Sequence, residues 1–131
     1  MIDVEDAVFD AVYRSVSKLV PKDCFKSVYV PNPPKFPFAT LMEMDNITDT
    51  EHQSNLQRDE YAILTYEANV YATNKAGCRN VMNALDKAMI HLGFTRTFMQ
   101  FIPNLADNTI FRYTARYRAT ADHDNVIYRH S

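Results

Sequence analysis

The sequence predicts an α+β domain: a mainly antiparallel sheet of about four to five strands, with two helices packed on one of its faces. Apolar residues alternate with period two at 62–72 and again at 110–120, which is typical of half-buried strands. Between them, at 81–92, apolar residues recur with the helical period. Strands joined by hairpins favour antiparallel pairing, and the apolar stripe of each helix needs the one clearly apolar side of the sheet.

Composition limits the classes of protein that fit. The 131 residues, 47% of them hydrophobic, suit a single domain over 1–131 with an exposed loop at 46–59 and a C-terminal tail at 122–131. A net charge of −2 gives no global field that would attract nucleic acid or an anionic membrane. No apolar run approaches the roughly 20 residues that span a bilayer, and the acidic start MIDVEDAVFD is unlike a signal peptide. We therefore expect synthesis and folding in a cytoplasm, without membrane contact.

The first third of the chain predicts one helix and one short strand. The helix covers Val4–Leu19, with Asp3 able to cap it and Pro21 ending it. Its apolar stripe consists of Val4, Val8, Ala11, Val12, Val16 and Leu19. A short edge strand is expected near Val28–Val30, followed by a stiff crossover that contains four prolines.

A second strand is expected at Phe38–Asp45, followed by the polar loop 46–59. Its two faces are predicted to carry Phe38, Thr40, Met42 and Met44 on one side and Ala39, Leu41, Glu43 and Asp45 on the other. The loop is far longer than a hairpin needs and has no large hydrophobic cluster to anchor it. It is interpreted either as an arm that contacts a partner or as an ordinary solvated loop.

The strand at 62–72 and the helix after it have the clearest signals. Even positions from Ala62 to Ala72 are expected inward, and Thr65, Glu67 and Asn69 outward. Thr73 or Asn74 is expected to cap the helix, and Gly93 to end it as a left-handed residue.

Two further strands are expected at Phe94–Ile102 and Ile110–Thr120, and Val126–Tyr128 is able to add an edge strand. On the strand 110–120 the predicted inward residues are Phe111, Tyr113, Ala115, Tyr117 and Ala119. The predicted outward residues are Arg112, Thr114, Arg116 and Arg118. The three arginines therefore form a row, for which three interpretations stay open: pairing with an acidic partner across a subunit interface, a solvated or intrachain-paired surface, or contact with nucleic acid.

No recognised catalytic or metal-binding pattern occurs. The four histidines lack paired-ligand spacing, and two glycines cannot build a glycine-rich phosphate loop. The cluster 122–124 of Asp, His and Asp falls in the predicted tail and is interpreted as solvated charge. We expect no enzyme activity, no cofactor and no bound metal.

Three segments resemble a known family. These are FPFATLMEMDN at 36–46, LTYEANVYATN at 64–74 and HLGFTRTFMQFIPNLADNTIFRYTARYRA at 91–119. They are similar to small proteins of tailed bacteriophages and prophages that are called tail terminators, tail completion proteins or minor capsid proteins of the head-tail joining region. The resemblance spans 36–119.

The resemblance implies a structural virion protein at the tail-neck junction, assembled in the bacterial host cytoplasm. Such a protein forms a ring, a hexamer in the family, that caps the tail tube and joins it to the head connector or stopper, with DNA only as passing cargo. Contact with a neighbouring subunit or the tube is expected for Arg112, Arg116 and Arg118, and for Glu51, Gln57 and Arg58 in the loop. The alternatives are another neck component, such as a connector adaptor or stopper, and a small cytoplasmic enzyme or ligand-binding domain.

Overall fold

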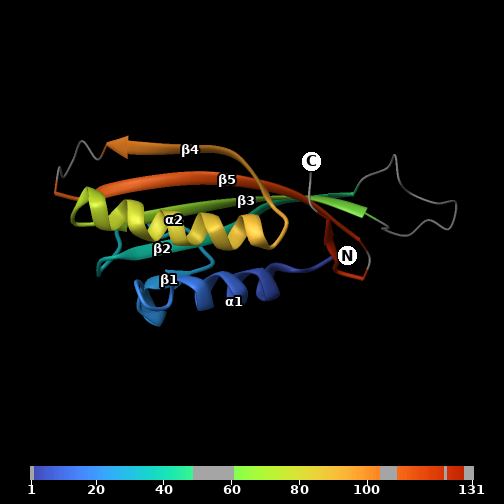
Figure 1. Cartoon of the computed structure of the whole chain (residues 1–131), viewed down its shortest axis with the longest axis horizontal. Coiled ribbons are helices and arrows are strands. Elements are labelled where there is room, and N and C mark those ends of the chain that lie inside the picture. Colours follow the sequence, from blue (N-terminus) through green and yellow to red (C-terminus); the bar gives the residue numbers. More distant parts are fainter. Residues whose placement is uncertain (1, 49–60, 104–108, 123, 129–131) are drawn as a thin grey trace, which may run out of the picture.

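The computed structural model describes residues 2–48, 61–103, 109–122 and 124–128, and it forms one sheet with two helices (Figure 1). The strands are ordered β1-β2-β3-β5-β4, and β6 pairs with β5. The elements are α1 (Glu5–Val16), a 3-10 turn (Lys22–Cys24), β1 (Phe25–Lys26), β2 (Phe38–Thr48), β3 (Tyr61–Ala72), α2 (Lys75–His91), β4 (Thr95–Pro103), β5 (Phe111–Asp122) and β6 (Ile127–Tyr128).

The α+β prediction is confirmed, with a sheet that is mixed instead of purely antiparallel. The four long strands are all antiparallel to their neighbours, whereas β1 pairs with β2 in parallel. The edge strand lies at Phe25–Lys26, so its predicted position at Val28–Val30 is wrong. Phe25 is buried because its ring packs on Phe9 at 4.6 Å between centroids, while Val28 is 61% exposed.

Strand β2 is longer than predicted and contains a bulge. It continues through Asn46–Thr48, which pair with 62–64 of β3, so the loop begins later than position 46. The register shifts between Glu43 and Asp45. The bulge adds one residue, Met44, to β2. As a result Asp45 lies on the face of Met42, opposite to the face that strict alternation predicts for it. The alternation holds up to the bulge.

Helix α1 is shorter than predicted, but its stripe is confirmed at Val8, Val12 and Val16, all buried. Leu19 was predicted inside and is 44% exposed; Val20 is buried in its place. The amides of both residues bond to the carbonyl oxygen of Val16, so the chain leaves the helical path there. Val4 occupies the N-cap position without a side-chain bond, and Asp3, one residue earlier, accepts a hydrogen bond from the Glu5 amide with its Oδ1 at 3.3 Å.

Helix α2 is bounded as predicted. The Asn74 side chain accepts a hydrogen bond from the Gly77 amide at 2.6 Å. At the other end, Gly93 has φ 105°, which a side chain would disfavour. The amides of Gly93 and Phe94 bond to the carbonyl oxygens of Ile90 and Met89, which is the Schellman arrangement.

Both helices cover the same face of the sheet, as predicted (Figure 1). All even positions of β3 from Ala62 to Ala72 are buried on this face, together with Ala115, Tyr117 and Ala119 of β5. The Tyr66 ring meets Phe94 edge-on at 5.1 Å. We call this surface the helix face.

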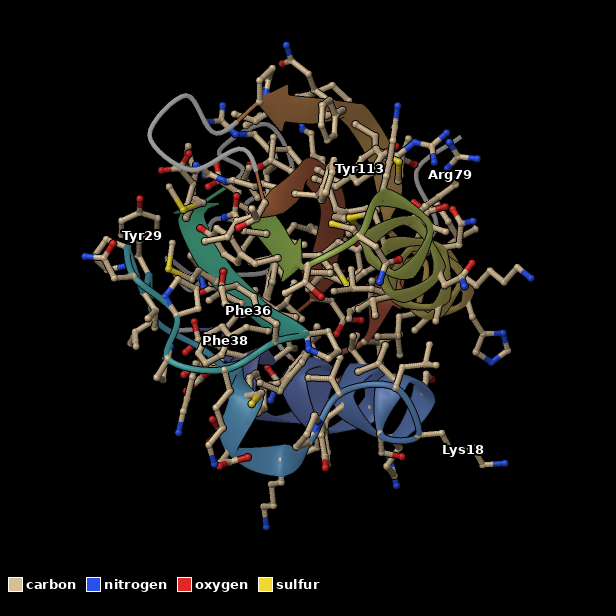
Figure 2. All side chains as sticks on the ribbon, turned by 90° about the vertical axis from the view of Figure 1, so that its left-hand side faces the viewer. Lys18, Tyr29, Phe36, Phe38, Arg79 and Tyr113 are labelled. Atoms are coloured by element: carbon tan, nitrogen blue, oxygen red, sulfur yellow. The ribbon has the colours of Figure 1, made fainter. Side chains whose placement is uncertain are left out.

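The opposite surface, which we call the open face, is covered near the start of β2 by other parts of the described chain. Phe38 and Tyr71 are buried there, and we attribute this to the proline-rich connection, from which Val30 and Phe36 pack against the core. Figure 2 shows this connection passing β2, with Tyr29 and Phe36 labelled. Asn69 and Thr114, predicted outward, do lie on this face but are buried, and Asn69 is 0% exposed.

Candidate assembly surfaces

A ladder of polar side chains crosses the open face between β3 and β5. The guanidinium of Arg112 donates to Asn69 Oδ1 from Nε at 3.2 Å and from Nη2 at 2.8 Å. The Asn69 amide donates in turn to Glu67 Oε1 at 3.1 Å. The other oxygen of that carboxylate, Oε2, accepts from Arg116 Nε at 3.0 Å. Asn69 is therefore buried without leaving its amide unsatisfied.

The guanidinium groups of Arg112 and Arg116 each lie over an aromatic ring. The Arg112 guanidinium lies 5.4 Å from the centre of the Tyr71 ring, and the Arg116 guanidinium 5.3 Å from that of Phe98. These contacts fix both side chains within their own subunit, although Arg116 remains 49% exposed and reachable by a partner.

Arg118 differs from its two neighbours in the row. It lies on β5 opposite Thr65 of β3 and Thr95 of β4, and it is exposed. Within the described ranges it forms no ion pair or side-chain hydrogen bond. Arg118 is thus the member of the predicted row whose charge is most available to another molecule.

The loop residues expected to contact a partner, Glu51, Gln57 and Arg58, lie outside the described residues. The strands that lead into and out of this loop, β2 and β3, end together at one end of the sheet (Figure 1). The contact of these three residues with a partner stays a prediction.

Exposed apolar side chains along two strands were not predicted as surface features. Met44 and Ile47 of β2 are 46% and 57% exposed, and Phe98 of β4 is 37% exposed. Ile47 and Phe98 share the open face with the arginines. Met44 lies within the predicted strand, whereas Ile47 lies in the predicted loop, and the β-branched residues Ile47 and Thr48 are the signal that the strand continues.

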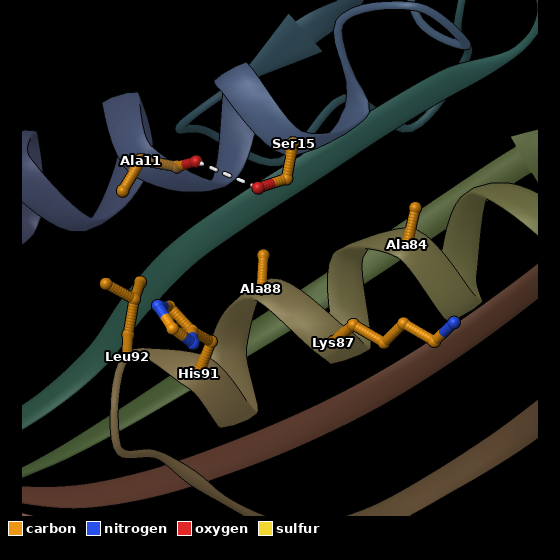
Figure 3. Close-up of a pocket in the computed structure, with 7 residues that line it drawn as sticks. All are labelled: Ala11, Ser15, Ala84, Lys87, Ala88, His91 and Leu92. Carbon is orange, nitrogen blue, oxygen red and sulfur yellow. Dashed lines mark hydrogen bonds between the residues drawn. The ribbon is translucent and has the colours of Figure 1, made fainter.

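A shallow groove of about 450 Å³ lies between the two helices (Figure 3). Small side chains line it, with Lys87 and His91 of α2 at its rim. The Ser15 hydroxyl donates to the carbonyl oxygen of Ala11 at 3.3 Å within its own helix. The residues lining this groove contain no nucleophile paired with a base.

On the helix face, two buried tyrosine hydroxyls donate to carboxylates. Tyr66 donates to Glu43 Oε1 at 3.1 Å, and Tyr117 donates to Asp86 Oδ1 at 2.8 Å. The other carboxylate oxygen of Asp86 pairs with Arg96 at 3.1 Å. Burial raises the pKa of Glu43, with smaller contributions from the nearby acidic residues Glu5 and Asp3. Burial likewise raises the pKa of both tyrosines. The first pair joins β3 to the neighbouring strand β2, the second joins β5 to α2, and neither pair lines the groove.

Asp122 is also bound, contrary to the interpretation of the 122–124 cluster as solvated charge. It ends β5, is 9% exposed, and its Oδ1 accepts from the amides of Asp124 and Val126. These bonds shape the turn into β6, which pairs with β5 as predicted for the tail. In the part of the chain that the structure describes, no group of three or more potential metal ligands occurs.

No helix within the described ranges is long and apolar enough to cross a membrane. No family model matches the sequence, and no curated protein matches it either.

Among solved structures, the fold matches a chain described as part of the "Virion of native gene transfer agent (GTA) particle". The match has a TM-score of 0.62 and covers 92% of this chain and 98% of that one. At 15% identity the match shows a shared fold, which extends over nearly the whole of that virion chain.

Proposed function

We propose that this chain is a structural component of a phage-like virion. The observation that carries the proposal is the fold shared with a chain of a gene transfer agent virion over 92% of this chain. Because that match extends over 98% of the virion chain, the likeness concerns a whole virion protein and not a fragment common to many folds.

Within the virion, we assign the chain to a ring that caps the tail tube and joins the tail to the head connector or stopper. Two features support this finer assignment: the resemblance of 36–119 to tail terminators, and an open sheet face that carries Arg118, Phe98 and Ile47 exposed. A subunit with dissimilar charged and apolar surfaces suits heterologous contacts, in which one surface meets a different surface of the neighbour. Such contacts are able to close into rings. The proposed protein needs no cofactor, and DNA is only its passing cargo.

The arginine row is proposed to face an acidic neighbouring subunit or the tube. Arg118 makes the direct contact, while Arg112 and Arg116 stay bound to Asn69 and Glu67 behind it. Glu51, Gln57 and Arg58 in the loop are proposed to reach an adjoining subunit or tube ring.

Electron microscopy of the purified protein with isolated tail tubes tests the proposal. Rings on tube ends support a terminator. Rings bound to portal instead would identify a connector adaptor or stopper, and a persistent monomer with a small-molecule ligand would contradict a virion role.

Arg118→Glu is the variant to compare in the same assay, with Lys18→Glu as its control. Both residues are exposed, but Lys18 lies just beyond the end of α1, away from the sheet (Figure 2). We expect at least tenfold fewer capped ends for Arg118→Glu and no change for Lys18→Glu. Equal capping by both variants would refute the role of the arginine row and leave the virion role standing.

A further inference from the structure

Within the part of the chain that the structure describes, the sheet has two outer edges without a strand partner. Strand β4 ends the sheet on one side along Arg96–Pro103. On the other side, β1 pairs with β2 at Ala39 and Thr40, and no described strand pairs with the outer side of β2 over Leu41–Thr48. Among the described residues, no backbone hydrogen bond from outside the sheet reaches either edge. Unpaired edges of this length are usually blocked or used for association.

The strand directions allow these two edges to meet in neighbouring copies. β2, β3, β5 and β4 are each antiparallel to the next strand, so β4 runs opposite to β2. When a second copy is placed beside the first by rotation about a common axis, its β2 therefore lies antiparallel to β4 of the first copy. The antiparallel order of strands would therefore continue from one subunit to the next.

Exposed apolar side chains accompany the two edges. Met44 and Ile47 stand on the free part of β2, and Phe98 stands on β4. Burying these apolar side chains favours association on either edge.

Charged residues, prolines and bulges commonly protect free edges against pairing. On β2 the bulge between Glu43 and Asp45 interrupts the free part, and the strand continues through Asn46–Thr48. On β4 the charged Arg96 and the register shift lie near the start and Pro103 at the last position, so Phe98–Ile102 carries none of these features.

The two sides of the molecule also differ in charge. Beside β2, the first half of α1 exposes Asp6 and Asp10, and Asp45 is exposed on β2 itself. Beside β4, α2 exposes Lys75 and Arg79, and the Lys75 ammonium lies 5.0 Å from the centre of the Phe101 ring of β4. A head-to-tail contact brings the acidic side of one copy to the basic side of the next.

We infer that the occupant of these edges is a second copy of this chain: β4 of one subunit adds antiparallel to Leu41–Thr48 of the next, so that one sheet continues from subunit to subunit. The contact is heterologous, with a different surface on each partner, and is thus able to close a ring. The inference deepens the proposed function, because it rests on the ring that the function requires and names the surfaces that build it.

Disulfide cross-linking tests the inference. Side chains on one face recur every two residues, so Gln100 on the open face of β4 should lie opposite one of the three open-face positions in the free part of β2, which are Met42, Asp45 and Ile47. The double variants are Met42→Cys, Asp45→Cys and Ile47→Cys, each combined with Gln100→Cys. Within one chain, three strand spacings, roughly 14 Å, separate β2 from β4, too far for a disulfide. The native thiols, Cys24 and Cys78, are buried.

We expect at least one oxidised double variant to form a ladder of covalent oligomers beyond the dimer, and every single variant to remain unlinked. Rings without a ladder in any of the three double variants would overturn strand addition while the ring itself stands. Dimers from a single variant would indicate an isologous contact and also overturn it. A chain that neither forms rings nor enters virions would refute the proposed function instead.

A second comparison uses association in place of cross-linking. Ile47→Lys places a charge beside the β2 edge, and Val28→Lys makes the same change at a residue that is equally open, 61% against 57% exposed, but outside the strands. We expect sedimentation to show association that is at least tenfold weaker for Ile47→Lys and unchanged for the control Val28→Lys. Equal association of the two variants would contradict the inference.

Discussion

The two faces of the sheet are built for different purposes. On the helix face, Leu64, Tyr66 and Tyr117 are at most 1% exposed and pack under α2 and α1. On the open face, beyond the part covered by the proline-rich connection, Ile47 is 57% and Phe98 37% exposed beside free charge at Arg118. Apolar burial, the main source of folding stability, is therefore concentrated on one face, and much of the other stays exposed and available for the proposed contacts.

The largest effect expected from this difference is on the helix face. Leu85→Ala removes a fully buried side chain of α2 and should cost about 2–5 kcal/mol of unfolding free energy. Arg118→Ala on the open face should change it by less than about 0.5 kcal/mol. Urea denaturation of both variants measures this, and similar losses would show that the open face also carries stability.

The next effect concerns the polar ladder on the open face, which is expected to support folding. Asn69→Leu deprives Arg112 and Glu67 of their shared partner in a buried position and should cost about 1–3 kcal/mol. Gln100→Leu, on an exposed residue of the same face, is the control. If thermal unfolding gave the same midpoint for the two variants, the ladder would be irrelevant to stability.

A smaller effect is expected at the start of α2, which covers the helix face. Asn74→Ala removes the N-cap acceptor of the Gly77 amide and should cost about 1 kcal/mol. Asn83→Ala, an exposed position within the same helix, should be neutral or slightly stabilising. Circular dichroism during thermal unfolding compares them, and an unchanged midpoint for Asn74→Ala would contradict the role of the cap.

The smallest effect concerns the pH dependence of stability. Burial raises the pKa of Glu43 above its ordinary value of 4.5, so folding favours the protonated carboxyl and stability is lost as the pH rises from 4.5 through the raised pKa. Glu43→Gln still accepts from Tyr66 and should be slightly more stable than the wild type at pH 7, with the difference vanishing below pH 4.5. Unfolding from pH 3 to 8 checks this, with Asp45→Asn as the exposed control. A wild type that is more stable than the variant at pH 7 would contradict it.

Much of the fold follows from local periodicity. The alternation on β3 and β5, the Asn74 cap and the left-handed Gly93 are set by neighbouring residues, and all were predicted. Asn69 was predicted to be solvated because alternation reports a face and not what covers it. Its burial depends on Arg112, 43 positions away in the chain.

The errors in β2 have a different physical cause. A bulge adds one residue between Glu43 and Asp45, and strict alternation cannot detect this. The polar Asn46 and Thr48 then look like the start of a loop, although they continue the strand and place Ile47 on the surface. The arginine row was predicted correctly as a row on β5, but its bonds within the chain depend on cross-strand register, which the sequence alone does not supply.

Cryo-electron microscopy of intact particles purified from cells that produce this chain tests the central claim most directly. The account predicts a closed ring of copies where tail meets head, with β4 of each subunit beside β2 of the next and the open face of the sheet in contact with a partner. Particles that lack the chain, or a chain present with its open face and both sheet edges in solvent, would contradict it.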